Sequence, residues 1–144
     1  MHFETSLTMN VPRAKAYAAF TDFESMPKWS KQVMTVRVLR RDGDTVYLVA
    51  QSASNERSRT ATRTMRLFPQ TRVESEGETR FVYTRRAVLF EEVASGMTKV
   101  TAILDVRIKG FWGLVLTSPR SETAEASVVE ELASFGKYVE GLSA

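Results

Sequence analysis

The sequence contains no cysteine and only one histidine, and these two shortages exclude several kinds of site. Without cysteine there is no disulfide, no thiolate metal ligand and no cysteine nucleophile, and the composition fits a reducing compartment. The lone histidine, His2, falls on the polar face of the first predicted strand, so no internal imidazole is available as a base or a metal ligand. We therefore expect no metal site and no cofactor.

Long hydrophobic runs and a dominant charge are also missing. No apolar stretch has the length of a membrane span and none has the pattern of a secretory signal, so we expect a cytoplasmic protein. The 20 basic and 17 acidic residues leave a net charge of only +3, and the arginines are scattered along the chain instead of forming a run. Nucleic acid is therefore not an expected partner. Neither a Ser-His-Asp set nor a phosphate-binding glycine loop is present.

The strongest positive signal is the amphipathic pattern of the last stretch, Ser118 to Leu142. Apolar residues recur there at steps of three and four, the spacing of one face of an α-helix. These residues are Val128, Leu132, Phe135, Val139 and Leu142. Polar residues fall largely off this stripe, among them Glu122, Glu125, Glu130, Ser134 and Lys137. The pattern predicts one long helix that buries a single side against another layer.

Nearly everything upstream of this helix has the pattern of β-strands. Apolar and polar residues alternate from Phe3 to Thr8, and two short helices are then predicted, one at Pro12 to Phe20 and one ending near Trp29. Six more strands are predicted between turn residues: Val33 to Arg40, Thr45 to Ser52, Arg59 to Phe68, Arg72 to Glu76, Arg80 to Glu92 and Lys99 to Lys109. The prediction is an α+β fold forming a single domain over residues 1–144, in which a curved antiparallel sheet of about seven strands wraps around the long C-terminal helix.

This order of elements resembles the helix-grip fold of the START-like (SRPBCC) superfamily, in its polyketide cyclase/dehydrase-like or coenzyme-Q-binding-like branch. Two local patterns carry the likeness besides the terminal helix: NVPRAKAYAAFTDFESMPKW, from Asn10 to Trp29, and FEEVASGMTKVT, from Phe90 to Thr101. The resemblance implies a cavity between helix and sheet that holds a hydrophobic or amphipathic small molecule. It specifies the fold more closely than the chemistry.

Arginines in the predicted strands are candidates for recognising such a molecule. Arg85 and Arg86 are adjacent, and one of them should point inward because successive strand side chains point to opposite faces. An inward guanidinium either meets a protein carboxylate, such as Glu74 or Glu92, or offers a bidentate site to an anionic group of a ligand. The family-like placement of Phe90 slightly favours Arg86 as the inward residue.

The same question arises for Arg59 and Arg63, which share a strand face with Met65 and Leu67. The apolar neighbours indicate that this face points inward. Alternatively, both side chains lie near a strand end or a bulge and reach solvent while their stems pack, and the sequence leaves the two interpretations about equal.

Aromatic and aliphatic residues complete the candidate set. The resemblance places Tyr17, Phe20 and Trp29 at one end of the cavity, but packing of an ordinary core is the favoured explanation for such large aromatic residues. Gly136, inside the long helix, is expected to allow tight packing on the sheet or, as a less favoured alternative, close approach of a ligand. The candidate ligand-binding residues are Phe20, Trp29, Arg63, Tyr83, Arg86, Val128, Leu132 and Phe135.

The most apolar run in the chain, Phe111 to Leu116, lies just before the long helix. One interpretation is a gate over the cavity mouth made by Phe111, Trp112 and Leu114, which would also serve for transient contact with a membrane or a protein. The other is that the end of the last strand simply packs over the helix, and this is slightly favoured.

Three functions compete at this stage. The first is a carrier or binding protein for a lipid-like molecule, with an anionic or polar head near Arg63 or Arg86. The second is a cyclase or dehydratase that pairs an arginine with a carboxylate or a tyrosine, such as Glu74 or Tyr83. The third is a protein-interaction module that uses the apolar run at residues 111–116.

Overall fold

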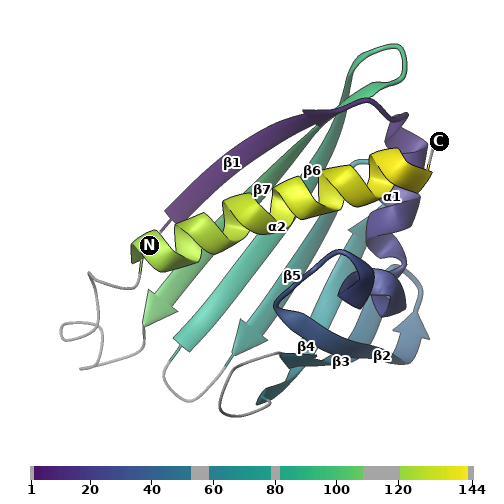
Figure 1. The fold of residues 1–144 in the computed structure, drawn as a ribbon. Helices are drawn as coiled ribbons and strands as arrows, with labels where there is room; N and C mark the ends of the chain where they lie inside the picture. Colours follow the sequence, from purple (N-terminus) through teal and green to yellow (C-terminus); the bar gives the residue numbers. More distant parts are fainter. Residues whose placement is uncertain (1, 53–58, 79–81, 109–120, 143–144) are drawn as a thin grey trace.

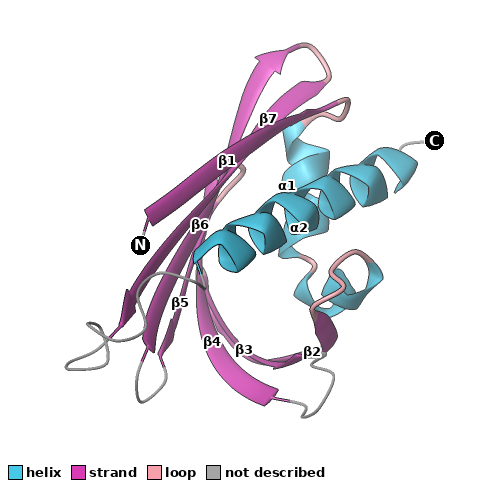
Figure 2. Cartoon of the chain, turned by 60° about the vertical axis from the view of Figure 1, so that its left-hand side comes forward, coloured by secondary structure: helices cyan, strands magenta, loops and turns pink. Residues whose placement is uncertain are grey.

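A computed structural model describes residues 2–52, 59–78, 82–108 and 121–142. In these residues a strongly bent sheet surrounds one long helix (Figures 1 and 2). The helices are α1 (Arg13–Thr21), the short 3-10 helix η1 (Phe23–Lys28) and α2 (Ser121–Leu142). The strands are β1 (His2–Met9), β2 (Val33–Asp42), β3 (Thr45–Ser52), β4 (Arg59–Phe68), β5 (Arg72–Glu78), β6 (Val82–Ala94) and β7 (Met97–Ile108).

The seven strands form one antiparallel sheet in the order β1-β7-β6-β5-β4-β3-β2. Strands β2 to β7 follow one another as a meander, and β1 closes the other edge by pairing with β7, with Phe3 opposite Leu104. The sheet curls so that α2 lies across its concave side, and α1 and η1 cover one end of that side (Figure 2). The predicted α+β helix-grip architecture is confirmed.

The ends of the elements differ from the sequence-based bounds by a few residues. Strand β5 continues to Glu78 because its pairing with β6 persists to Tyr83. Strand β2 continues to Asp42, where it pairs with Thr45 across a tight turn that places Gly43 at a positive φ of 58°. The predicted strand start at Arg80, the strand end at Lys109 and the first helical turn from residue 118 lie outside the described residues.

The apolar stripe of α2 is buried except at its end. Leu132, Phe135 and Val139 are at most 7% exposed, whereas Leu142 is 55% exposed. The prediction that Leu142 is buried is therefore wrong, because the last turn of the helix extends past the core, where Glu140 and Gly141 are also exposed.

Close contact between α2 and the edge strand β1 depends on Gly136. A Cβ atom at this position would lie 3.0 Å from Cδ2 of Leu7 and 3.6 Å from Cε of Met9. The glycine therefore lets the helix approach the sheet, as the favoured interpretation predicts. The Glu140 carboxylate also accepts a hydrogen bond from the backbone N–H of Asn10 at 3.0 Å, which fixes the same end of the helix.

Candidate ligand-binding pocket

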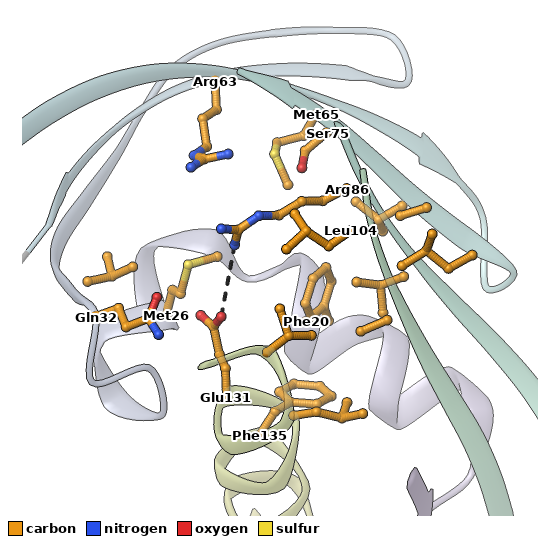
Figure 3. A pocket seen from close by; sticks show the side chains of 18 of the residues that line it. Phe20, Met26, Gln32, Arg63, Met65, Ser75, Arg86, Leu104, Glu131 and Phe135 are labelled. Carbon is orange, nitrogen blue, oxygen red and sulfur yellow. Dashed lines mark ion pairs between the residues drawn. The ribbon is translucent and has the colours of Figure 1, made fainter. Parts of the chain in front are cut away.

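A pocket of ≈ 320 Å³ lies between the middle of α2 and the concave face of the sheet, with residues of α1, η1 and the segment after them along one side (Figure 3). Most of its lining is apolar, from Met26 in η1 to Leu48 and Val100 on the sheet. The bend of the sheet creates this space, because a helix contacts a strongly curved surface along only part of its length.

An aromatic cluster forms one end of the pocket. The ring centroids of Trp29 and Phe135 are 4.9 Å apart, and those of Phe20 and Phe135 are 5.5 Å apart, with both pairs edge to face. Trp29 is 7% exposed, and its indole N–H has no hydrogen-bond partner among the described residues. This end of the pocket is therefore rigid and apolar, with one unused donor.

Arg63 enters the pocket from β4, where strand alternation places it on the same face as Met65. Gly77 on β5 lies beside it, and a Cβ atom at that position would be in ordinary van der Waals contact with Nη1 of Arg63, at 3.4 Å. Within the described part of the chain, Arg63 forms no ion pair. Burial, and secondarily the nearby charge of Arg86, lower the pKa of Arg63, while Glu131 acts in the opposite direction.

Arg86 enters from β6 and reaches toward the helix. Its Nη1 lies 3.9 Å from Oε2 of Glu131 (Figure 3). Oε1 of the same carboxylate accepts a hydrogen bond of 2.8 Å from Ser30 Oγ. The Nε atom of Arg86 is buried and finds no acceptor in the described residues. Glu131 thus links the sheet, the segment after η1 and α2 through one side chain.

The other arginine of the adjacent pair points away from the pocket. Arg85 is exposed, and its Nη2 lies 3.6 Å from Oε1 of Glu74, which also pairs with Arg72 at 3.3 Å. The structure therefore resolves the alternative left open by the sequence: Arg86 faces inward, and the predicted internal pair with Glu74 belongs to Arg85.

Seven of the eight candidate ligand-binding residues line the pocket: Phe20, Trp29, Arg63, Arg86, Val128, Leu132 and Phe135. Tyr83 does not. It shares strand parity with Arg85 and is absent from the lining, so its proposed contact with a ligand finds no support in the geometry. The gate residues Phe111, Trp112 and Leu114 lie outside the described residues, as does the side chain of Arg59.

Glu131 is the functional candidate that the sequence analysis missed. The signal was present in the helical spacing, because Glu131 follows Val128 by three residues and precedes Phe135 by four, which puts it on the buried face. A carboxylate there was overlooked beside the apolar stripe. Ser30 and Gln32 were missed because nothing in their local pattern distinguishes a pocket residue from a loop residue.

The described residues show neither a cluster of metal-ligating side chains nor a membrane-spanning helix. Across the described ranges, no three histidine, aspartate or glutamate side chains are grouped so as to hold a metal ion. Among the helices in the same ranges, none is both long and apolar enough to cross a membrane.

Comparisons with known proteins identify relatives by family and by fold. A family model described as polyketide cyclase / dehydrase and lipid transport matches residues 1–140. No curated protein sequence matches the chain. Among solved structures, TTHA0849 from Thermus thermophilus is similar with a TM-score of 0.85 at 15% identity, over 100% of both chains.

Two other solved structures carry descriptive names. The Zhui aromatase/cyclase from Streptomyces sp. R1128 has a TM-score of 0.86 at 12% identity, covering 97% of this chain and 93% of that one. A START superfamily protein from Mycobacterium smegmatis has a TM-score of 0.73 at 16% identity, covering 97% and 94%. Sequence identities of 12–16% show a shared fold only, and this fold is consistent with the family match. The chain is a member of the polyketide cyclase/dehydrase and lipid transport family, and it shares its fold with the START superfamily structure.

Proposed function

We propose that this protein binds and carries a hydrophobic small molecule in the pocket between α2 and the sheet. The observation that carries the proposal is the apolar pocket of ≈ 320 Å³, which has only a few polar groups on its wall. Ligand sites typically have volumes of about 300–1,000 Å³ and combine apolar walls with a small number of polar groups. The family description, which includes lipid transport, points to the same class of ligand.

The packing around the pocket supports a binding role. Phe20, Trp29 and Phe135 are held against one another by ring contacts, so the apolar wall is preorganised and little ordering is required when a ligand enters. Val128 and Leu132 add an aliphatic wall from α2. An apolar molecule with few polar groups therefore matches this surface.

Displacement of a neutral fluorescent probe tests the proposal. N-phenyl-1-naphthylamine should increase in fluorescence when mixed with the protein, and decan-1-ol should displace it. Ala102 lines the pocket, so Ala102→Phe fills part of it and should weaken probe binding by about tenfold or more. Ala133→Phe is the matched control, because Ala133 is exposed on α2 and does not line the pocket. Failure of the wild type to bind either compound, or equal binding by Ala102→Phe, contradicts the proposal.

A second function, cyclisation or dehydration of a bound molecule, is favoured by one observation. Glu131 places a carboxylate in the pocket opposite two guanidinium groups, which is the arrangement needed to remove a proton from carbon and stabilise the resulting enolate. The family description includes cyclases and dehydrases. Glu131, and not the Glu74 or Tyr83 suggested by the sequence, would then be the base.

Solvent exchange separates the two functions. If the protein is an enzyme, it should accelerate deuterium incorporation into a bound 1,3-diketone, as followed by NMR. Glu131→Gln should lose this acceleration and still bind the probe. If wild type and Glu131→Gln give the same exchange rate as buffer, the binding function alone accounts for the pocket.

A further inference from the structure

The charges that face the pocket do not balance. Its described lining contains two cations, Arg63 and Arg86, and one anion, Glu131, which leaves a formal charge of +1. An uncompensated charge among apolar side chains is costly, because the protein replaces little of the water that the ion has lost. A bound group with one negative charge would restore neutrality.

The two arginines are not equivalent. Arg86 already faces the Glu131 carboxylate at 3.9 Å, whereas Arg63 has no ion-pair partner within the described ranges. Figure 3 shows the guanidinium group of Arg63 pointing into the pocket from the wall opposite α2. Opposite it on β5, Gly77 contributes no side chain that would compete for its N–H groups. Arg63 is therefore the cation that remains available to a ligand.

Hydrogen-bond donors without a partner among the described residues also lie beside this space. The Nε atom of Arg86 and the Nε1 atom of Trp29 are both buried, and neither has an acceptor among the described residues. Arg63 adds up to five N–H donors, and a guanidinium fork matches the two oxygens of a carboxylate. Buried donors normally find partners, and the Arg63 guanidinium, which points into the pocket (Figure 3), is where acceptor atoms of a ligand would be met.

We infer that the pocket selects a hydrophobic ligand with a single carboxylate, and that Arg63 binds this group. The inference rests on the proposed function, since it specifies the charge of the molecule held in the same pocket. Glu131 sets the limit of one negative charge, because a group with two charges would face an unbalanced carboxylate on the opposite wall. Glu131 therefore acts as the counter-charge that favours a carboxylate over a phosphate monoester.

Three ligands with the same ten-carbon chain test this selection: decanoate, decan-1-ol and decyl phosphate. Each displaces N-phenyl-1-naphthylamine from the wild-type protein at pH 7.5, below its micelle concentration. We expect the affinity for decanoate to be about tenfold or more higher than that for the alcohol. A difference of this size corresponds to the free energy of a charge-assisted hydrogen-bond pair. Decyl phosphate should bind more weakly than decanoate. Equal affinities for acid and alcohol, or the tightest binding by the phosphate, overturn the inference.

Two substitutions assign the preference to residues. Arg63→Met keeps the length and apolar stem of the side chain and should bring the affinities for decanoate and decan-1-ol close to each other, which removes the preference for the acid. Arg66→Met is the matched control on the same strand, because Arg66 is exposed and does not line the pocket. Glu131→Gln should increase the affinity for decanoate by about tenfold, since it leaves both arginines without an internal counter-charge. The affinity for decyl phosphate should increase by a larger factor for the same reason.

The outcomes separate this inference from the proposed function. If decan-1-ol binds and decanoate shows no preference that depends on Arg63, the protein is a carrier and the charge selection is wrong. If none of the three compounds displaces the probe, both fail. Retained binding of the alcohol shows that a variant is folded, and Arg63→Lys provides a second variant in which a reduced preference should remain, because lysine keeps the charge and loses the fork.

Discussion

Arg86 on β6 and Glu131 on α2 face each other across the pocket, with Nη1 and Oε2 3.9 Å apart. The pair joins the sheet to the helix at a place where apolar side chains do not fill the space between them. Because the Arg86 side chain is 38% exposed, the ion pair itself contributes little to stability. The pair matters for the charge of the pocket, because Glu131 is already paired with Arg86. Arg63 is then the cation of the described lining that has no ion-pair partner.

The hydrogen bond from Ser30 to Glu131 should stabilise the fold more than the ion pair does. We expect Ser30→Ala and Glu131→Ala each to lower the free energy of unfolding by about 1 kcal/mol, and the double variant to lose less than the sum. Urea denaturation of the four proteins in this cycle measures the coupling. Glu131→Gln keeps the acceptor oxygen and should lose less than Glu131→Ala. Strict additivity of the two alanine substitutions would contradict this assignment.

Gly136 should be intolerant of a large side chain. Gly136→Leu should lower the free energy of unfolding by about 2 kcal/mol or more, because its Cβ would lie 3.0 Å from Leu7 and its branches would meet the fully buried Met9. Gly141→Leu is the matched control on the same helix, since a Cβ there has no heavy atom within 4 Å. Leucine favours a helix more than glycine does at both positions, so similar losses for the two variants in urea denaturation would contradict the assignment of the effect to contact with β1.

Leu132 serves both the core and the pocket, and its truncation should affect both. It is 7% exposed, so Leu132→Ala should cost about 2–5 kcal/mol of stability through lost contacts and a larger cavity. The enlarged pocket should also accept a longer alcohol, such as tetradecan-1-ol, relative to decan-1-ol. Val129→Ala, at a neighbouring position that is 47% exposed, should change neither property measurably. An unchanged chain-length preference in Leu132→Ala would place the ligand elsewhere.

Tyr17 should make stability depend on alkaline pH. Burial, and secondarily the charge of Asp44, raise the pKa of its phenol above the ordinary value of 10.0. Above pH 10 the unfolded chain therefore loses this proton more readily than the folded protein, so the free energy of unfolding falls as the pH rises through this range. In Tyr17→Phe the fall should be smaller, and the phenolate absorbance change at the highest pH should disappear. The same pH profile in both proteins would contradict the assignment.

The fold was largely predictable because its signals are local and repeated. Strand alternation, turn residues and the helical stripe from Val128 to Val139 each persist over many residues, so errors at single positions change only the element ends. The seven-stranded order also follows for β2 to β7, since short turns leave neighbours paired. The end of α2 was less predictable, because the burial of Leu142 depends on where the sheet stops.

The pocket was predictable in part. The sequence predicted the pocket residues on the apolar stripe of α2 and the aromatic residues between Asn10 and Trp29. Apolar side chains at regular spacing must be buried somewhere. The choice between Arg85 and Arg86 required the register of β6, which adjacent residues in a strand cannot reveal. Tyr83 was misplaced although alternation puts it on the face of Arg85, so an inward Arg86 already implies an outward Tyr83. Glu131 pairs with residues more than forty positions away in the chain, and no local pattern encodes such a contact.

The most direct test of the account uses the indole N–H of Trp29, a buried donor on the wall of the pocket. The chain has two tryptophans, so a ¹H–¹⁵N spectrum contains two indole resonances, and Trp29→Phe assigns the relevant one. Titration with decanoate should shift the Trp29 resonance, with saturation at the affinity found by probe displacement. An unchanged Trp29 resonance at saturating decanoate would show that the ligand does not occupy this pocket, and would contradict the account.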